Sequence, residues 1–107
     1  ESLKHILINL INNAADAMPH GGNLTIWLYK KGTQARMHII DTGKGMTKET
    51  LSRLYEPFFT TKPVGQGTGL GLYIVFNEIE KMNGKINVIS KAGKGTTFKI
   101  QLSEDGE

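Results

Sequence analysis

The sequence contains no cysteine, few aromatic residues and no long hydrophobic run. Without cysteine, the chain can form neither a disulfide framework nor a thiolate metal site. One tryptophan, three tyrosines and four phenylalanines are few for a surface that stacks nucleic-acid bases, so no nucleic acid is expected among the partners. No apolar stretch approaches the roughly 20 residues that span a bilayer, and nothing resembles a signal peptide. These absences leave a folded domain whose function depends on its loops and polar residues.

Glycine and positive charge are present in excess. The chain has 13 glycines, more than core packing needs, and its net charge of +3 suits a polyanionic ligand. The length predicts one domain over residues 1–107. Because the chain starts inside a helical pattern, we expect it to be part of a longer protein. A cytoplasmic location is expected, with any membrane attachment supplied by segments outside this domain.

Residues 2–18 have the pattern of an amphipathic helix. Apolar residues recur there at three- and four-residue steps and form one stripe. They are Leu3, Ile6, Leu7, Leu10, Ile11, Ala14, Ala17 and Met18. Asn9, Asn13 and Asp16 form a second, polar stripe beside it. Asparagine is a poor residue for the middle of a helix, so two on one face suggest a ligand. A solvated polar face is the simpler interpretation, and the helix pattern alone favours it.

Two strands are predicted at residues 24–31 and 35–41, and they are expected to pair as a hairpin. By parity, Met37, Ile39 and Asp41 share one face of the second strand. If the two apolar residues face the core, Asp41 faces it as well. A carboxylate in that position needs a hydrogen-bond donor.

Asp41 is followed at once by Gly43 and Gly45. Glycine permits positive φ and lets a ligand approach the backbone closely, so Asp41 could face the edge of a planar ligand. Alternatively, it is a buried structural residue that caps its own glycine turn. Two more glycine clusters follow, at residues 67–71 and 93–96. The first of these opens a helical pattern, and the free N–H groups and dipole at a helix start favour anions.

The rest of the chain completes an α+β pattern. A short helix is predicted at 47–55, a loop at 56–66, a helix at 70–83 that Gly84 ends, and strands at 85–91 and 96–102. The order predicts a two-layer α/β sandwich, with three helices on one face of a mostly antiparallel or mixed sheet. The crevice between the layers would bring the asparagine stripe, Asp41 and the glycine loops together.

The glycine loops do not match several known nucleotide signatures. The cluster at 67–71 lacks the GxGxxG spacing of dinucleotide folds and the GxxxxGK[ST] of P-loops. The signatures of Ser/Thr/Tyr kinases are absent too. Asparagine oxygens nevertheless suit Mg²⁺ where phosphates supply the negative charge. A carboxylate for a purine amine, two asparagines for Mg²⁺ and a helix start for phosphates together predict an ATP site.

Five motifs in order resemble the catalytic, ATP-binding domain of bacterial sensor histidine kinases, in the Bergerat-fold ATPase superfamily. They are NLINNAADA at 9–17 (N box), DTGKGM at 41–46 (first glycine box), EPFFTTK at 56–62 (F box), GTGLGL at 67–72 and GKGTTF at 93–98 (second and third glycine boxes). The resemblance covers roughly residues 3–102. The N and F boxes are similar to those of sporulation and nitrogen-regulation kinases, which suggests a sporulation-type kinase.

The resemblance implies roles for single residues. Asn13 would be the main Mg²⁺ ligand, with Asn9 beside it near the phosphates. Asp41 would accept a hydrogen bond from the adenine N6 amine, Gly45 would lie behind the base, and Thr96 would join the water network around Asp41. The residues implied in nucleotide binding are Asn9, Asn13, Asp16, Asp41, Gly43, Gly45, Met46, Gly67, Thr68, Gly69, Leu70, Gly71 and Thr96. Those implied in catalysis are Asn9, Asn13 and Lys62.

The resemblance also implies a lid over ATP, at residues 47–68. Gly67, Gly69 and Gly71 would let it fold over the phosphates. Lys62 is the candidate for a lid cation near the γ-phosphate, although a solvated loop lysine is nearly as good an interpretation.

Position 9 bears on the reaction class. Hydrolytic members of the superfamily, and serine kinases that act on anti-sigma-factor antagonists, carry glutamate four residues before the Mg²⁺ asparagine, where it acts as a general base. Asn9 stands there in this chain. A neutral imidazole is already nucleophilic and needs less activation, so phosphoryl transfer to histidine is favoured. A Bergerat ATPase or serine kinase is the alternative, and a basic, non-catalytic binding module is a third class.

Partners follow from the same resemblance. The phosphorylated histidine would lie on a separate helical hairpin of the same kinase, which forms a homodimer through that hairpin. A response regulator would then receive the phosphoryl group. This chain lacks the hairpin and the strand that usually precedes the first helix. Alone, it is expected to bind ATP without phosphorylating itself.

Overall fold

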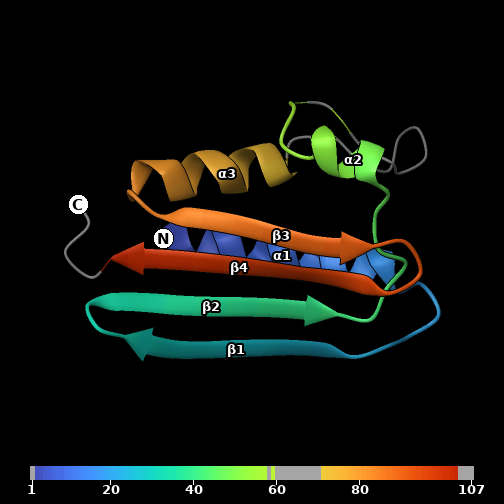
Figure 1. Ribbon diagram of the computed structural model, residues 1–107, viewed down its shortest axis with the longest axis horizontal. Coiled ribbons are helices and arrows are strands. Elements are labelled where there is room, and N and C mark those ends of the chain that lie inside the picture. The colour runs from blue at the N-terminus through green and yellow to red at the C-terminus, as the bar shows by residue number, and fades with distance from the viewer. Residues whose placement is uncertain (1, 58, 60–70, 104–107) are drawn as a thin grey trace.

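The computed structural model describes residues 2–57, 59 and 71–103, apart from the side chain of Ser2. The predicted site residues outside these ranges are Lys62, Gly67, Thr68, Gly69 and Leu70. The elements, shown in Figure 1, are α1 (Ser2–Ala17), β1 (Leu24–Lys31), β2 (Gln34–Asp41), α2 (Lys48–Ser52), α3 (Gly71–Lys81), β3 (Lys85–Lys91) and β4 (Gly95–Ser103). None of the described helices is long and apolar enough to cross a membrane.

The described strands form a four-stranded antiparallel sheet in the order β1-β2-β4-β3. β2 and β4 lie at its centre, and Asp41 of β2 is directly opposite Thr96 of β4. Thr96 is in turn opposite Ser90 of β3. Because directly opposed residues share a face of the sheet, the register places three polar residues in one row.

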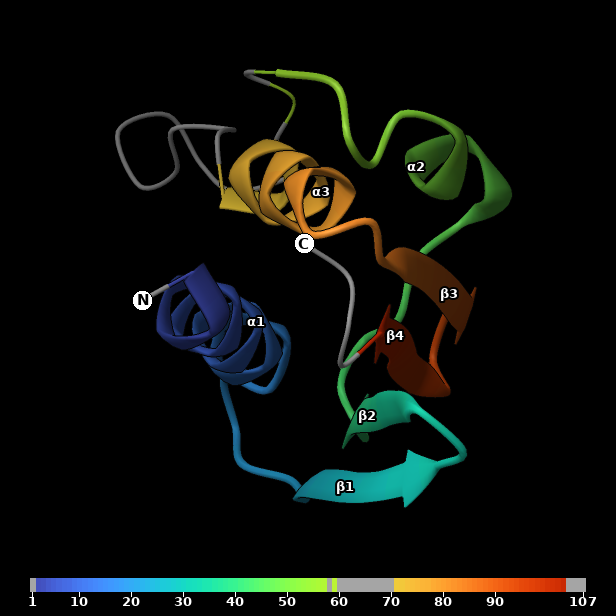
Figure 2. The same ribbon diagram turned by 90° about the vertical axis from the view of Figure 1, so that its left-hand side faces the viewer.

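α1 and α3 pack against each other and cover one face of the sheet (Figure 2). On α1, Ile6, Leu10 and Ala14 lie one turn apart and are buried. Every second residue of β2 and β4 meets them, because alternate side chains of a strand share a face. The largest fully buried side chains are Ile6, Leu10, Ile39, Ile79, Ile100 and Val75. The predicted α+β sandwich is confirmed, and its described sheet is antiparallel throughout.

The helix ends differ from the prediction in detail. Thr47 caps α2, since its side chain accepts a hydrogen bond from the backbone N–H of Thr50. The helix ends at Ser52, earlier than the predicted end at residue 55. After α3, the residue with positive φ is Asn83 (φ 56°), not Gly84. Asparagine tolerates this left-handed conformation better than most residues, so it provides the stop that the sequence assigned to glycine.

Candidate functional site

Asp41 ends β2 and faces the helix layer, as the parity of the strand predicts. The residue is 6% exposed. Its Oδ1 accepts a hydrogen bond from the backbone N–H of Gly43 at 2.8 Å. The other carboxylate oxygen has no hydrogen-bond partner within the described parts of the chain. Asp41 therefore caps its own glycine turn and still keeps one oxygen to accept a hydrogen bond from a ligand.

A series of hydrogen bonds extends from Thr96, the residue opposite Asp41. Thr96 is 5% exposed, and its Oγ1 lies 2.8 Å from the Oγ of Ser90. Ser90 Oγ accepts from the backbone N–H of Met46 at 2.9 Å and donates to the carbonyl of Gly95 at 3.0 Å. Because the Ser90 hydroxyl hydrogen is used for the Gly95 carbonyl, the Thr96 hydroxyl is the donor to Ser90. The oxygen of Thr96 can still accept a hydrogen bond. Ser90 was not among the predicted site residues, and only its place opposite Thr96 could have indicated it.

The first glycine turn is packed between the end of α1 and the last residue of β3. A Cβ on Gly43 would lie 2.5 Å from the carbonyl oxygen of Ala17, and one on Gly45 would overlap the carbonyl oxygen of Lys91. Gly45 also has a φ of 68°. The N–H of Lys44 donates to the Ala17 carbonyl at 3.0 Å. Backbone packing thus requires these glycines, in addition to any room that they leave for a ligand.

The asparagine stripe of α1 faces the start of α3. Asn9 Nδ2 donates to the carbonyl of His5 at 2.9 Å, which leaves Oδ1 available. A Cβ on Gly71, the first residue of α3, would lie 3.5 Å from this oxygen. Asn13 is half-buried on the same stripe and makes no hydrogen bond to another described residue. Asp16 is exposed at the end of the stripe. Two amide oxygens are therefore available to a cation near a helix start.

The described residues contain no group of three or more His, Cys, Asp or Glu side chains that could hold a metal ion. A cation at the asparagine stripe would be coordinated by neutral amide oxygens. The negative charge that it needs would have to come from the bound molecule. Mg²⁺ bound to phosphates meets this condition, since Mg²⁺ prefers oxygen ligands and often combines a few protein oxygens with phosphates. The residues present therefore fit a magnesium–nucleotide complex.

An open cavity of about 700 Å³ lies at the end of the sheet beside Asp41. Asp41, Met46 and Thr96 all line it, so the structure brings these three predicted residues together, whereas Gly43 and Gly45 do not line it. No described residue of α1 lines the cavity. Asn9 and Asn13 consequently form a separate group, and the described residues do not join the two groups in one cavity.

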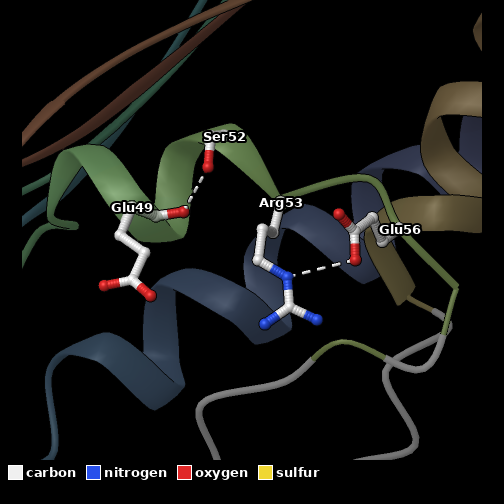
Figure 3. Close-up of polar contacts among 4 residues, drawn as sticks. All are labelled: Glu49, Ser52, Arg53 and Glu56. Carbon is white, nitrogen blue, oxygen red and sulfur yellow. Dashed lines mark hydrogen bonds and ion pairs between the residues drawn. The ribbon is translucent and has the colours of Figure 1, made fainter.

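Local polar contacts hold the end of α2 (Figure 3). Ser52 Oγ donates to the carbonyl of Glu49 at 2.7 Å, and Arg53 pairs with Glu56 at 3.1 Å. The Arg53 guanidinium also lies 4.5 Å from the ring centroid of Phe59. An exposed ion pair adds little stability, so these contacts mainly orient the chain. Phe59 of the F box thus has a cation–π partner within this domain.

Tyr55 connects the segment after α2 to α3. Its ring stacks on that of Phe76, with centroids 4.8 Å apart and an interplanar angle of 23°. Its hydroxyl is buried and has no hydrogen-bond partner among the residues that the structure describes. Burial raises the pKa of Tyr55 to about 12, because the phenolate is poorly solvated there. Tyr55 therefore supports the helical side of the site while leaving one polar group unsatisfied.

Solved structures of histidine kinases resemble this chain closely. The mycobacterial sensor histidine kinase MprB matches with a TM-score of 0.83 and 31% identity, over 95% of this chain and 70% of that chain. The catalytic domain of the histidine kinase ThkA matches with a TM-score of 0.82 and 32% identity, over 96% of this chain and 66% of that chain. These similarities confirm the predicted fold.

Curated relatives point to the same family. Sporulation kinase A of Bacillus subtilis is 45% identical over 94% of this chain and 16% of its own length. The sensor kinase CckA of Brucella abortus is 41% identical over 92% of this chain and 12% of its own length. The chain thus spans a small part of these relatives. Residues 1–106 match a family described as histidine kinase-, DNA gyrase B- and HSP90-like ATPase. The chain belongs to this ATPase family, and its curated relatives include sensor histidine kinases and sporulation kinases, as the N and F boxes predict.

Proposed function

We propose that this domain binds Mg-ATP and donates the γ-phosphoryl group to a histidine on a separate helical hairpin of the same kinase. The hairpin forms the homodimer, and a response regulator then receives the phosphoryl group in the cytoplasm. The identity of residue 9, an asparagine, is the observation that supports phosphoryl transfer to histidine. Its amide stands four residues before Asn13, where hydrolytic relatives place a glutamate, and its oxygen faces the start of α3.

The sheet side of the site recognises the base in this proposal. The open oxygen of Asp41 accepts from the N6 amine of adenine, and Thr96 offers a further acceptor beside it. Adenine presents a donor at this position and guanine an acceptor, so a carboxylate selects adenine. Gly45 and Met46 complete the wall beside the base.

The helical side holds the phosphates. Bound Mg²⁺ neutralises charge on the phosphates during transfer. Asn13 is the proposed metal ligand, with Asn9 beside it, and the N–H groups at the start of α3 face the phosphates. Lys62 and the glycines at 67, 69 and 71 are proposed to close over them. The domain positions the γ-phosphoryl group, and positioning with charge stabilisation accounts for most of phosphoryl-transfer catalysis.

An ATPase or serine kinase remains the alternative. Both would need a general base to activate water or a hydroxyl. Asn9 cannot accept a proton at neutral pH, and Asp16, the remaining acid of the stripe, is exposed three residues beyond Asn13. The described residues of the stripe therefore favour a nucleophile that needs no base, which is what a neutral imidazole provides.

The test mixes this chain with the purified cognate hairpin and γ-labelled ATP. We expect an acid-labile, base-stable phosphoprotein on the hairpin, and neither label nor appreciable hydrolysis with the chain alone. The matched variant Asn9→Glu should raise hydrolysis, if a water can be positioned, and lower transfer to histidine. Rapid hydrolysis by the unaltered chain, or an acid-stable phosphoserine on an added partner, would establish the alternative instead.

A further inference from the structure

The sheet has a second face that no described helix covers. α1 and α3 lie on one side of the sheet (Figure 2), and Figure 1 looks directly at the other side. We call this uncovered side the outer face. It carries the residues of each strand that alternate with inward-facing core residues such as Ile39 and Phe98.

The outer face is basic. Its charged residues are Lys31 of β1, Arg36 of β2, Lys85 and Lys91 of β3 and Lys99 of β4. No acidic residue points outward from the four described strands, since Asp41 is buried on the inner face. The other described acids lie on or beside helices, at Asp16, Glu49, Glu56, Glu78 and Glu80. The helix side thus carries charges of both signs, including Lys4, Lys48 and Lys81, whereas the charged residues of the outer face in the described strands are all positive.

An aromatic cluster lies on the outer face. Trp27 is directly opposite His38, and these rings meet nearly edge to face, with centroids 5.8 Å apart at 83°. Tyr29 packs on both, at 5.7 Å from Trp27 and 5.5 Å from His38. Trp27 is nevertheless 59% exposed and Ile89 is 57% exposed. Both apolar side chains are therefore open to solvent, and Trp27 is packed against two neighbouring rings.

Arg36 and Lys99, which lie beside this cluster, have no carboxylate partner among the residues that the structure describes. Arg36 donates from Nε and Nη2 to Oε1 of Gln34, at 3.1 and 2.8 Å. This neutral contact fixes the guanidinium and leaves its other donors free. Lys99 forms no ion pair with any residue in the described ranges. A guanidinium held in place without a counter-charge is prepared to bind a carboxylate.

We propose that the outer face is a docking surface for an acidic region of another protein domain, with Trp27 as its apolar anchor. Trp27 is exposed on the edge strand β1, and the half-buried Arg36 lies diagonally across from it on β2. Tryptophan and arginine are the residues most enriched where interfaces bind tightly. Carboxylates of the partner would pair with Arg36 and Lys99, while an apolar side chain packs on Trp27. Trp27, Arg36 and Lys99 do not line the cavity beside Asp41, although Ile89 and Lys91 of the outer face do. The proposal therefore does not depend on phosphoryl transfer.

Two other occupants fit less well. Bases of a nucleic acid stack on flat, separated rings, whereas Tyr29 and His38 turn their edges and faces toward each other and are further joined by a contact of 3.4 Å between Tyr29 Oη and His38 Nε2. A second copy of this chain would bring five positive side chains against five like charges, which opposes association.

The test uses the fluorescence of Trp27, which is the only tryptophan in the chain. The probe is a soluble helical peptide of glutamates with leucine at every fourth position. Titration should shift and change the emission, with an affinity that falls as salt rises. Replacing Arg36 and Lys99 together by glutamate should weaken binding at least about tenfold. The matched control replaces Lys4 and Lys81 of the helices by glutamate, which changes net charge equally and should retain the affinity.

Four further results would contradict the proposal. An all-glutamate peptide or single-stranded DNA that binds as tightly would show general attraction to polyanions. Equal loss in the control variant would show the same. An emission change that depends on protein concentration alone would show self-association, and no binding of the peptide would also overturn the proposal. Trp27→Ala, followed by calorimetry, should abolish the leucine-dependent part of binding, and ATP affinity should stay unchanged in every variant as evidence of intact folding.

Discussion

The two halves of the candidate nucleotide site are constructed differently. In the sheet half, Asp41, Thr96 and Ser90 form one row across three strands, and each makes a hydrogen bond with a neighbouring side chain or the backbone. In the helix half, Asn9 and Asn13 offer amide oxygens that meet no donor within the described residues. The polar groups of the sheet half are thus held by hydrogen bonds within the protein, whereas the amide oxygens of the helix half are open to the proposed cation.

This difference matches the chemistry of ATP. The base is unchanged when the phosphoryl group leaves, so a rigid complementary surface can hold it throughout. The phosphates change in charge and position, and in the proposed function the helix half holds them, so we expect it to open and close in each cycle. Substitutions in the sheet half should therefore alter folding and base choice, whereas those in the helix half should alter metal-dependent affinity.

The largest expected effect is the loss of stability that Gly95→Ala causes in the sheet half. Gly95 has a φ of 102°, and a Cβ there would overlap the carbonyl oxygen of Asp41. Strain and overlap together should lower the free energy of unfolding by about 4 kcal/mol, measured by urea denaturation. Gly93→Ala is the matched control, because φ is 81° there but no atom lies within 4 Å of the added Cβ. It should lose only about 1 kcal/mol, and equal losses at both positions would refute the packing argument.

Asn13→Ala should impair metal binding in the helix half without affecting base binding in the sheet half. Removing one oxygen that contacts a charged partner should weaken Mg-ATP binding by about 3 kcal/mol, while binding of ATP in chelator should hardly change. Calorimetry with and without Mg²⁺ measures both values. The control is Asn12→Ala, which removes the same amide from an exposed position on α1. Unchanged Mg-ATP affinity in Asn13→Ala would remove this residue from the metal site.

Much of the sheet half could be predicted from the sequence. Strand parity places Asp41 on the core face together with Met37 and Ile39, and the burial of Asp41 confirms it. The two interpretations of Asp41 turn out to be compatible, because one oxygen caps the glycine turn and the other is open. Strand alternation is a local property with a period of two residues, which is why it could be followed without a structure.

Other features depend on contacts between distant segments. Ser90 resembles any serine in a strand, and its hydrogen bond to the N–H of Met46 joins residues 44 positions apart. Gly45 and Gly95 suggest room for a ligand, yet their immediate neighbours are backbone atoms of Lys91 and Asp41. The roles of Lys62 and of residues 67–70 stay predictions, since they lie outside the described ranges.

Asp41→Asn changes base recognition in the sheet half and leaves the helix half intact. The amide oxygen can still accept from the N–H of Gly43, so the fold should be retained. The amide nitrogen would then replace the open oxygen, and a donor facing the N6 amine of adenine would lose the hydrogen bond. Adenine selectivity should fall by about 2 kcal/mol, measured as the ratio of ATP to GTP affinities by competition. A parent protein that binds GTP as tightly as ATP would already exclude this role for Asp41.

The smallest expected effect is a gain in stability from Tyr55→Phe, on the helical side of the site. Phenylalanine keeps the stacking on Phe76 and removes a buried hydroxyl that has no partner among the described residues. The free energy of unfolding should rise by at most about 1 kcal/mol at neutral pH, because an unsatisfied buried polar group is costly. Urea denaturation at a series of pH values measures it.

The pH dependence of this gain has a definite sign. Burial raises the pKa of Tyr55 from 10.0 to about 12 in the folded state. Above pH 10 the unfolded chain releases the phenol proton while the folded chain retains it, so the parent protein loses stability from this group as pH rises toward 12. Tyr55→Phe cannot show that loss, and its advantage over the parent should therefore widen through this interval. Tyr73→Phe, at a more exposed position on α3, serves as the control for the general effect of alkali. A constant difference between Tyr55→Phe and the parent across the interval would mean that water reaches the hydroxyl of Tyr55.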